Sequence, residues 1–213
     1  MNNTKTLIAG TVVEGFIFSH EVYDEKFFKG YVAVKRASGT EDIIPVIVSE
    51  HLFDANLDYS GKFIYITGEF RSRNIHVGTK ISLDLFVFAS SVEEPVAVAD
   101  LNSVSLEGYI CKAPVFRLTP FGREICDLMV AVNGSFGRSY YIPCICWGRD
   151  ARYAEGFSIG VKVRIFGRIQ SREYQKTLAD GSCENRVAYE VSAGKIQLTE
   201  SKKNRLSDSH QIG

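Results

Sequence analysis

An alternating strand pattern that occurs twice limits the fold of this chain more than any other feature. Residues 161–174 read VKVRIFGRIQSREY and residues 62–75 read KFIYITGEFRSRNI. Both stretches alternate up to a glycine, Gly167 or Gly68, and continue to a Ser-Arg pair. Such alternation is typical of a strand that buries one side. In the later copy the other side is basic and aromatic, which suits a sheet that holds a nucleic acid strand.

The segments around these strands also correspond in order, so the sequence predicts two copies of one domain. The aligned pairs are Val13–Ile17 with Leu106–Ile110, Val32–Val34 with Val130–Val132, Ile44–Val48 with Ile142–Cys146, Gly61 with Gly160, and Ser72-Arg73 with Ser171-Arg172. The offset grows from 93 residues (Val13 to Leu106) to 99 (Gly68 to Gly167), as small loop insertions would cause. We expect an N-terminal domain at 1–95, a C-terminal domain at 96–200 and a flexible tail at 201–213.

Each copy reads as three short strands, a short helix and two more strands. In the first copy the expected strands are Thr11–Ser19, Tyr31–Lys35, Ile43–Val48, Lys62–Phe70 and Ile81–Phe88, with a helix in the segment SEHLFDANL at 49–57. This order is that of an OB-fold, a five-stranded Greek-key barrel whose face often binds oligonucleotides. An SH3-like barrel would lack the helix. The prediction is an all-β protein with short helices and two tandem OB-fold domains.

The charge is balanced over the whole chain but not between its halves. Residues 1–101 hold 9 Lys+Arg and 14 Asp+Glu, whereas residues 102–213 hold 16 and 11. The halves therefore carry −5 and +5, and a basic half is a hint of nucleic-acid or membrane contact. No apolar run approaches the roughly 18 residues of a membrane span, and residues 1–10 do not resemble a signal peptide, so we expect no membrane contact.

Cysteines and titratable residues give no sign of a metal site or an active site. Five cysteines without a framework spacing favour reduced thiols in a cytoplasm. Cys144 and Cys146 share one strand face and are read as small buried residues, because zinc needs about four suitably spaced ligands. No phosphate loop, carboxylate pair or nucleophile–base motif is apparent. We expect a non-enzymatic protein without a cofactor or a metal.

Residues 102–198 resemble the bacterial single-stranded DNA-binding proteins of the replicative SSB family. The resemblance rests on Asn102–Ile110, Pro114 with Phe116–Gly122, Leu128–Asn133, Cys146–Ala151, Gly160–Tyr174 and Tyr189–Ile196. It implies an OB-fold that binds single-stranded DNA in replication, recombination or repair. The first copy is related to the family only as a diverged repeat.

The resemblance also implies which residues contact DNA. The family's stacking positions are all aromatic here, although each differs in type: Phe136, Tyr141, Trp147 and Tyr174. The expected phosphate contacts are Arg117, Arg138, Arg149, Lys162, Arg164, Arg168 and Arg172. Strict alternation independently puts Trp147 on the strand face of Tyr141, although a lone Trp is often a core residue. The basic residues have a plainer interpretation as a solvated strand face.

The first copy lacks aromatic residues at the equivalent positions, which are Ile43, Ser49 and Ile75. We expect this copy to bind DNA weakly or to serve dimerisation. Residues with the right chemistry to compensate are Phe27, Phe28, Lys29, Tyr31, Lys35, Arg36, Arg71 and Arg73.

The expected partner is single-stranded DNA, bound by a homodimer that brings four OB domains together, with replication or recombination proteins as further partners. The C-terminal sequence SKKNRLSDSHQIG lacks the acidic tip of bacterial SSBs, which favours an accessory, mobile-element or paralogous form. The alternative is an OB-fold assembly adaptor of the primosome or conjugation type with little DNA affinity. Zero net charge, the lost aromatic residues and the missing tip favour that alternative.

Overall fold

The computed structural model describes residues 3–77, 80–94, 98–177 and 181–199, and these are mostly strands. The first half contains β1 (Thr4–Val22), β2 (Glu25–Lys35), β3 (Glu41–Ser49), the 3-10 helix η1 (Glu50–Leu52), β4 (Phe63–Val77) and β5 (Lys80–Glu93). The second half contains β6 (Leu101–Ile110), β7 (Val115–Leu118), β8 (Glu124–Asn133), η2 (Ser135–Gly137), β9 (Ser139–Trp147), α1 (Arg149–Glu155), β10 (Lys162–Thr177) and β11 (Cys183–Leu198). The expected tail, 201–213, lies outside the described residues.

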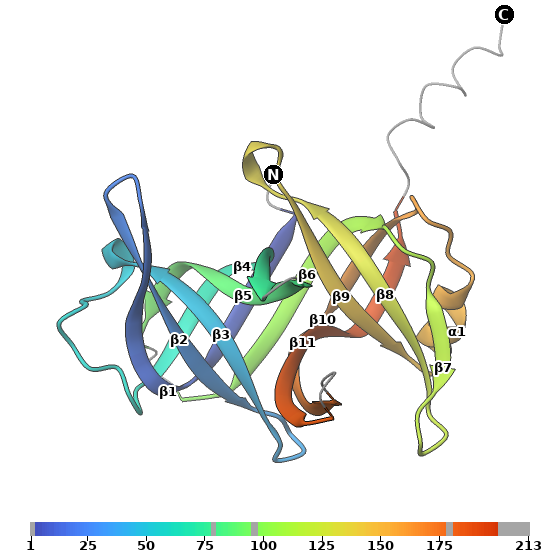
Figure 1. Ribbon diagram of the computed structural model, residues 1–213, viewed down its shortest axis with the longest axis horizontal. Coiled ribbons are helices and arrows are strands. Elements are labelled where there is room, and N and C mark those ends of the chain that lie inside the picture. Colours follow the sequence, from blue (N-terminus) through green and yellow to red (C-terminus); the bar gives the residue numbers. More distant parts are fainter. Residues whose placement is uncertain (1–2, 78–79, 95–97, 178–180, 200–213) are drawn as a thin grey trace, which may run out of the picture.

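Two five-stranded barrels lie side by side (Figure 1). In the first, the strand order β2-β3-β5-β4-β1 is closed by pairing of β1 with β2. In the second, the order β6-β10-β11-β9-β8 is closed by pairing of β6 with β8, and β7 adds a hairpin strand to β8. The third and fifth strands of each barrel, β3 with β5 and β9 with β11, pair in parallel. The prediction of two tandem OB-fold domains is confirmed.

The helix after the third strand forms in only one copy. Helix α1 follows β9 as expected, whereas the predicted helix at 49–57 is reduced to the 3-10 turn η1. Phe53 is extended and packs against the rings of Phe16 and Tyr59 at 5.2 and 5.6 Å. The Asp54 carboxylate then accepts hydrogen bonds from Asn56, at both its backbone N–H and its side-chain amide. This local bonding competes with helix formation, and the packing of the partly buried Phe53 ring favours the extended backbone.

Several strands are longer than the sequence suggested. Strand β1 begins at Thr4 instead of Thr11, and its early residues Ile8 and Ala9 are buried. Strand β7 was not among the strands expected from the sequence. These strand ends are stabilised by pairing with distant segments, β6 and β4 for the start of β1 and β8 for β7, which local alternation does not reveal.

The repeat alignment needs one correction, in the first strand. Gly10, not Gly15, is the counterpart of Gly108. A Cβ at Gly10 would lie 2.2 Å from the carbonyl oxygen of Ala33, and one at Gly108 would lie 2.4 Å from the carbonyl oxygen of Ala131. Around Gly15 the nearest atoms are side-chain oxygens at 3.1 and 3.3 Å. The offset between the copies is thus nearly constant, because Gly10 and Gly108 are separated by 98 residues and Gly68 and Gly167 by 99.

This correction has a measurable consequence. We expect Gly10→Ala to lower the free energy of unfolding by about 2 kcal/mol, because the new Cβ forces two paired backbones apart. Gly15→Ala, with only flexible side-chain ends nearby, is expected to cost less than about 1 kcal/mol. Urea unfolding of both variants measures the difference, and equal losses would contradict the corrected alignment.

The two barrels are joined through their first strands. Strands β1 and β6 pair antiparallel from Thr4↔Leu106 to Ala9↔Leu101, so one sheet runs through both halves. The repeated serines form matching bonds across the junction: Ser72 Oγ accepts from Tyr141 N at 2.8 Å, and Ser171 Oγ accepts from Ile43 N at 3.0 Å. Each serine of the repeated Ser-Arg element therefore accepts a backbone hydrogen bond from the other barrel.

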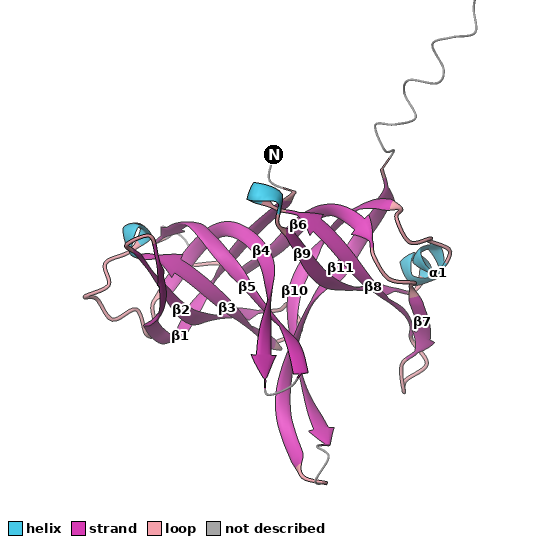
Figure 2. Cartoon of the chain, turned by 45° about the horizontal axis from the view of Figure 1, so that its top comes forward, coloured by secondary structure: helices cyan, strands magenta, loops and turns pink. Residues whose placement is uncertain are grey.

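The β4–β5 and β10–β11 hairpins extend beyond the barrels on the same side of the molecule (Figure 2).

The thiols of Cys126, Cys144 and Cys146 are buried, and burial raises the pKa of Cys126 to about 11 and that of Cys146 to about 12. The interpretation of Cys144 and Cys146 as small core residues is confirmed. Within the described ranges, no helix is long and apolar enough to cross a membrane.

Candidate nucleic-acid interface

The outer face of β9 carries aromatic side chains. Ile142, Cys144 and Cys146 fill the barrel interior, so Tyr141 and Trp147 lie on the opposite side of the strand. Tyr141 is 44% exposed, and Trp147 is partly exposed at the end of the strand. Both are placed on a barrel surface, where a flat ring can be reached by a ligand.

Trp147 lies in a hollow of about 500 Å³, here called the Trp147 groove. The indole Nε1–H donates to Ser192 Oγ at 3.1 Å, which fixes the ring against β11. The groove is lined by Arg36, Arg123, Trp147, Arg168, Gln170, Ser171, Arg172 and Ser192. Four arginines around one indole have the chemistry to bind an anion attached to a flat ring.

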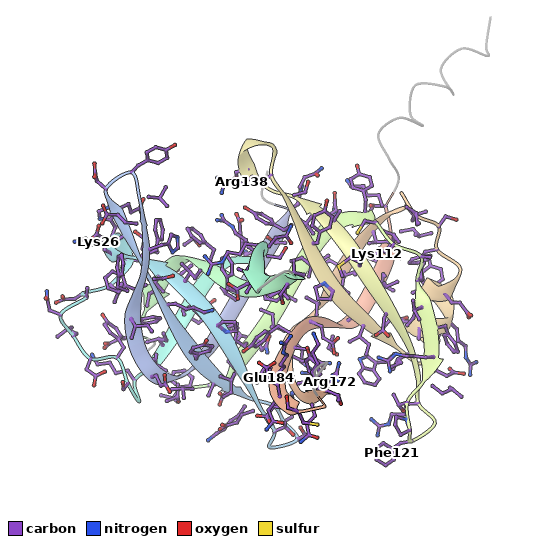
Figure 3. The ribbon with its side chains drawn as sticks, in the orientation of Figure 1. Lys26, Lys112, Phe121, Arg138, Arg172 and Glu184 are labelled. Carbon is purple, nitrogen blue, oxygen red and sulfur yellow. The ribbon has the colours of Figure 1, made fainter. Side chains whose placement is uncertain are left out.

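Tyr174 continues this surface along β10. The guanidinium of Arg172, which lines the Trp147 groove, lies 5.9 Å from the centre of the Tyr174 ring. Tyr174 is 37% exposed and shares a neighbouring hollow with Pro143 of the β9 outer face. Arg172 of β10 and Glu184 of β11 both lie on the β10–β11 hairpin (Figure 3), where the register pairs Arg172 with Ala188 and Lys176 with Glu184. The structure thus brings together Trp147, Arg168, Arg172 and Tyr174 of the residues expected from sequence.

Other expected contacts lie elsewhere. Arg138 is on the far side of the junction from Arg172 (Figure 3) and lines a second hollow, here called the Phe88 groove. That groove is lined by His20, Ile47, Arg71, Ser72, Arg73, Phe86, Phe88, Arg138, Ser139 and Tyr140.

Two further expected contacts, Arg117 and Arg149, line neither of these grooves. Arg117 forms an ion pair with Asp127 at 2.6 Å, and Arg149 is exposed at the start of α1. The backbone of Phe136 is in η2, and its side chain is outside what the structure describes.

Lys162 and Arg164 share a single carboxylate as ion-pair partner. Glu107 of the neighbouring strand β6 forms ion pairs with both, and Arg164 Nε reaches its Oε2 at 2.9 Å. These two hydrogen bonds hold the pKa of Glu107 below its usual value of 4.5. The pairing therefore stabilises the fold above about pH 4.5, and this stabilisation is lost as the pH falls through the lowered pKa.

Removing that carboxylate provides a test of the two cations. We expect Glu107→Gln to raise the affinity for oligo-dT about fivefold at pH 7, because Lys162 and Arg164 become free to contact phosphates. The plot of log affinity against log salt should steepen by up to ~0.7 for each cation that takes a phosphate. The exposed residue Glu21 gives a matched control, Glu21→Gln, with the same charge change. Equal affinities of the two variants would show that Lys162 and Arg164 belong to a solvated face.

Some candidate residues were missed or misplaced by sequence reasoning. Arg36 was assigned to the first copy, but it lines the Trp147 groove of the second. Arg123, at the end of the β7–β8 turn, was not singled out. Phe86 and Phe88 of β5 line the Phe88 groove in the first half. Leu85 and Val87 face the barrel interior, and this alternation would have placed Phe86 and Phe88 on the outer face of the strand.

Comparison with known proteins bears on the half of the chain that carries the Trp147 groove. The model of the single-strand binding protein family matches residues 101–199. The second half of the chain is therefore similar to this family. The match covers all the strands of the second barrel.

Individual single-stranded DNA-binding proteins are similar to part of the chain. The single-stranded DNA-binding protein of Oceanobacillus iheyensis is 31% identical over 111 residues, which are 48% of this chain and 65% of that protein. Single-stranded DNA-binding protein 1 of Staphylococcus aureus is 33% identical over 82 residues, 35% of this chain and 49% of that protein. The chain thus spans about half to two thirds of the length of these relatives.

Solved structures match both barrels together. The wild-type single-stranded DNA binding protein of Thermus aquaticus superimposes with a TM-score of 0.74 over 94% of each chain at 18% identity. A deletion mutant of the same protein gives a TM-score of 0.71 at 19% identity. At this identity the likeness concerns the fold, and it includes the arrangement of the two tandem OB domains.

Proposed function

We propose that this protein binds single-stranded DNA without strong sequence preference, mainly through its second half. The observation that carries the proposal is the Trp147 indole on the outer face of an SSB-family barrel, within a groove lined by four arginines. The relatives in O. iheyensis and S. aureus are named as single-stranded DNA-binding proteins. The chemistry of the groove fits the same ligand, because it offers a ring for a base and cations for phosphates.

In this mechanism the bases stack and the phosphates are held by charge. Stacking on an aromatic ring contributes about 1–3 kcal/mol per base and tolerates any sequence, since every base has a π-face. Tyr141, Trp147 and Tyr174 supply the rings, with Phe136 as a further stacking residue. Arg168 and Arg172 hold phosphates beside Trp147, and the other cations that we assign to phosphates are Arg117, Arg138, Arg149, Lys162 and Arg164. Phosphate contacts fix the strand in position without reading its sequence.

We further propose that binding protects single strands during replication, recombination or repair. This role requires no catalytic step and no cofactor. The alternative, an OB-fold assembly adaptor with little DNA affinity, is not favoured, because the half that matches the SSB family also contains the arginine-lined groove. Replication or recombination proteins remain proposed partners.

The domain division and the assembly are part of the proposal. We place the domains at 1–95 and 96–200 and assign to the first a weaker DNA contact or a role in dimerisation. A homodimer would bring four OB domains together. Native mass spectrometry is expected to give twice the chain mass of 23.8 kDa. A monomeric mass with and without oligo-dT would contradict the dimer.

Fluorescence anisotropy tests the proposed function directly. We expect the full-length protein to bind labelled oligo-dT of about 16 nucleotides, a length on the scale of one OB-fold site. A mixed-sequence single strand should bind within a few-fold of oligo-dT, and a duplex of the same sequence much more weakly. Equal affinity for the duplex, or no binding at low salt, would contradict the proposal.

A further inference from the structure

The Trp147 groove is completed by a residue from the other barrel. Arg36 follows β2 in the first half, and its hairpin is closed by two hydrogen bonds, Arg36 N to Thr40 O at 2.8 Å and Gly39 N to Arg36 O at 2.9 Å. Gly39 has a positive φ of 84°, which suits this tight turn. The short hairpin places Arg36 beside Arg168, Arg172 and Trp147 of the second half. The groove therefore spans the junction of the two barrels.

One buried carboxylate positions this arginine. Asp42 is fully buried and accepts from Arg36 Nε at 2.7 Å and from Arg36 Nη2. It also accepts from Arg168 Nη1 at 3.2 Å and from the backbone N–H of Ser171 at 2.9 Å. A two-point contact with a carboxylate fixes the plane of a guanidinium. In the described hydrogen bonds, the Nη1 group of Arg36 has no acceptor and is left for a ligand.

The groove carries more positive charge than its protein partners neutralise. Four arginines line it, and Asp42 is the carboxylate that pairs with two of them. Among the described residues, Arg123 and Arg172 have no carboxylate within ion-pair distance. Burial and the nearby charge of Arg36 hold the pKa of Arg168 below its usual range, as expected where cations are crowded. An anion bound in the groove would relieve this repulsion.

The equivalent place in the other barrel carries a smaller excess of positive charge, because two of its three arginines are paired with carboxylates. By the repeat, Tyr140 stands where Asp42 does and Glu69 where Arg168 does. In the Phe88 groove, Arg71 is paired with Glu69 at 2.9 Å, and Arg73 with Asp84 at 2.9 Å. The two ends of the junction are therefore alike in fold but different in charge, and the larger positive excess lies at the Trp147 end.

We propose that Arg36 of the first barrel binds a backbone phosphate of the strand whose base stacks on Trp147, together with Arg168 and Arg172, and that Asp42 positions Arg36 for this contact. This inference rests on the proposed function. A phosphodiester is favoured over the carboxylates of an acidic peptide because Trp147 and Tyr174 flank the cations and offer stacking surfaces for bases. Single-stranded DNA then contacts both barrels within a single site.

Full-length Arg36→Gln is the test, with labelled oligo-dT at several salt concentrations. We expect about a tenfold lower affinity and a log–log salt slope smaller by ~0.7, the loss of one phosphate contact. Lys26→Gln is the matched control, because Lys26 is exposed on the first barrel far from Arg172 (Figure 3) and loses the same charge. If wild type binds and the two variants bind alike, the inference is overturned. If wild type does not bind, the proposed function itself fails.

A second measurement on unmodified protein keeps the test independent of folding. Phenylglyoxal labels arginine side chains, and mass spectrometry locates the label. We expect oligo-dT to slow the labelling of Arg36 several-fold while Arg152, which pairs with Glu124 on the α1 side, is labelled at the same rate with and without DNA. Equal labelling of Arg36 with and without bound oligo-dT would overturn the inference. Protection by an acidic peptide but not by oligo-dT would assign the groove to a protein ligand and overturn it as well.

Discussion

Replacing Trp147 with alanine is expected to weaken binding of oligo-dT about thirtyfold, corresponding to about 2 kcal/mol, because a partly exposed indole on the outer face of the second barrel is lost. The indole is fixed against β11 by its hydrogen bond to Ser192, so it is already oriented for stacking and loses little freedom on binding. Anisotropy of a labelled oligonucleotide measures the change and does not depend on tryptophan emission.

Two companion variants separate stacking from general damage to the protein. Trp147→Phe retains a ring and is expected to lose affinity by an intermediate amount. Tyr23→Ala removes a fully exposed ring at the β1–β2 turn and is expected to bind as wild type. If Trp147→Ala bound oligo-dT as tightly as Tyr23→Ala, Trp147 would be a structural residue only.

Asp42→Ala is expected to lower the free energy of unfolding by about 2–3 kcal/mol. The substitution leaves the guanidiniums of Arg36 and Arg168 and the N–H of Ser171 without their acceptor at the junction. Breaking a fully buried ion pair costs about 3–5 kcal/mol, and the cost is smaller here because both arginines keep some contact with water. Urea unfolding followed by circular dichroism measures the loss.

The neighbouring residue provides the control. Glu41 pairs with Lys35 at 3.9 Å on an exposed edge, so Glu41→Ala is expected to change stability little. Similar losses for Asp42→Ala and Glu41→Ala would mean that the junction cluster contributes no more than a surface ion pair.

Features set by local alternation could be predicted from the sequence. Side chains of a strand alternate between its two faces, so a strand at 141–147 puts Trp147 on the same face as Tyr141. The repeated glycines Gly68 and Gly167 were recognised as a pair, and the structure gives the reason. A Cβ at either position would lie 2.2–2.3 Å from a carbonyl oxygen of the partner strand, so only glycine fits.

Features created at the junction could not be predicted in the same way. The chain separates Arg36 from Trp147 by more than a hundred residues, and the pairing of β1 with β6 and the hydrogen bonds across the junction bring their barrels together. The same holds for Glu107, which forms ion pairs with Lys162 and Arg164 from the adjacent strand. A basic strand pattern does not show whether its charges are free, because the neutralising carboxylate comes from a distant segment.

Titration of the full-length protein with oligo-dT, followed by the fluorescence of its single tryptophan, tests the central claim most directly. Since Trp147 is the only tryptophan in the sequence, any change in emission reports on the Trp147 groove. We expect saturable quenching whose affinity falls steeply as salt rises, because bases stack on the indole while arginines release counterions from phosphates. Unchanged emission at low salt, with oligo-dT bound or not bound, would contradict the claim that Trp147 is the stacking centre of a single-stranded DNA site.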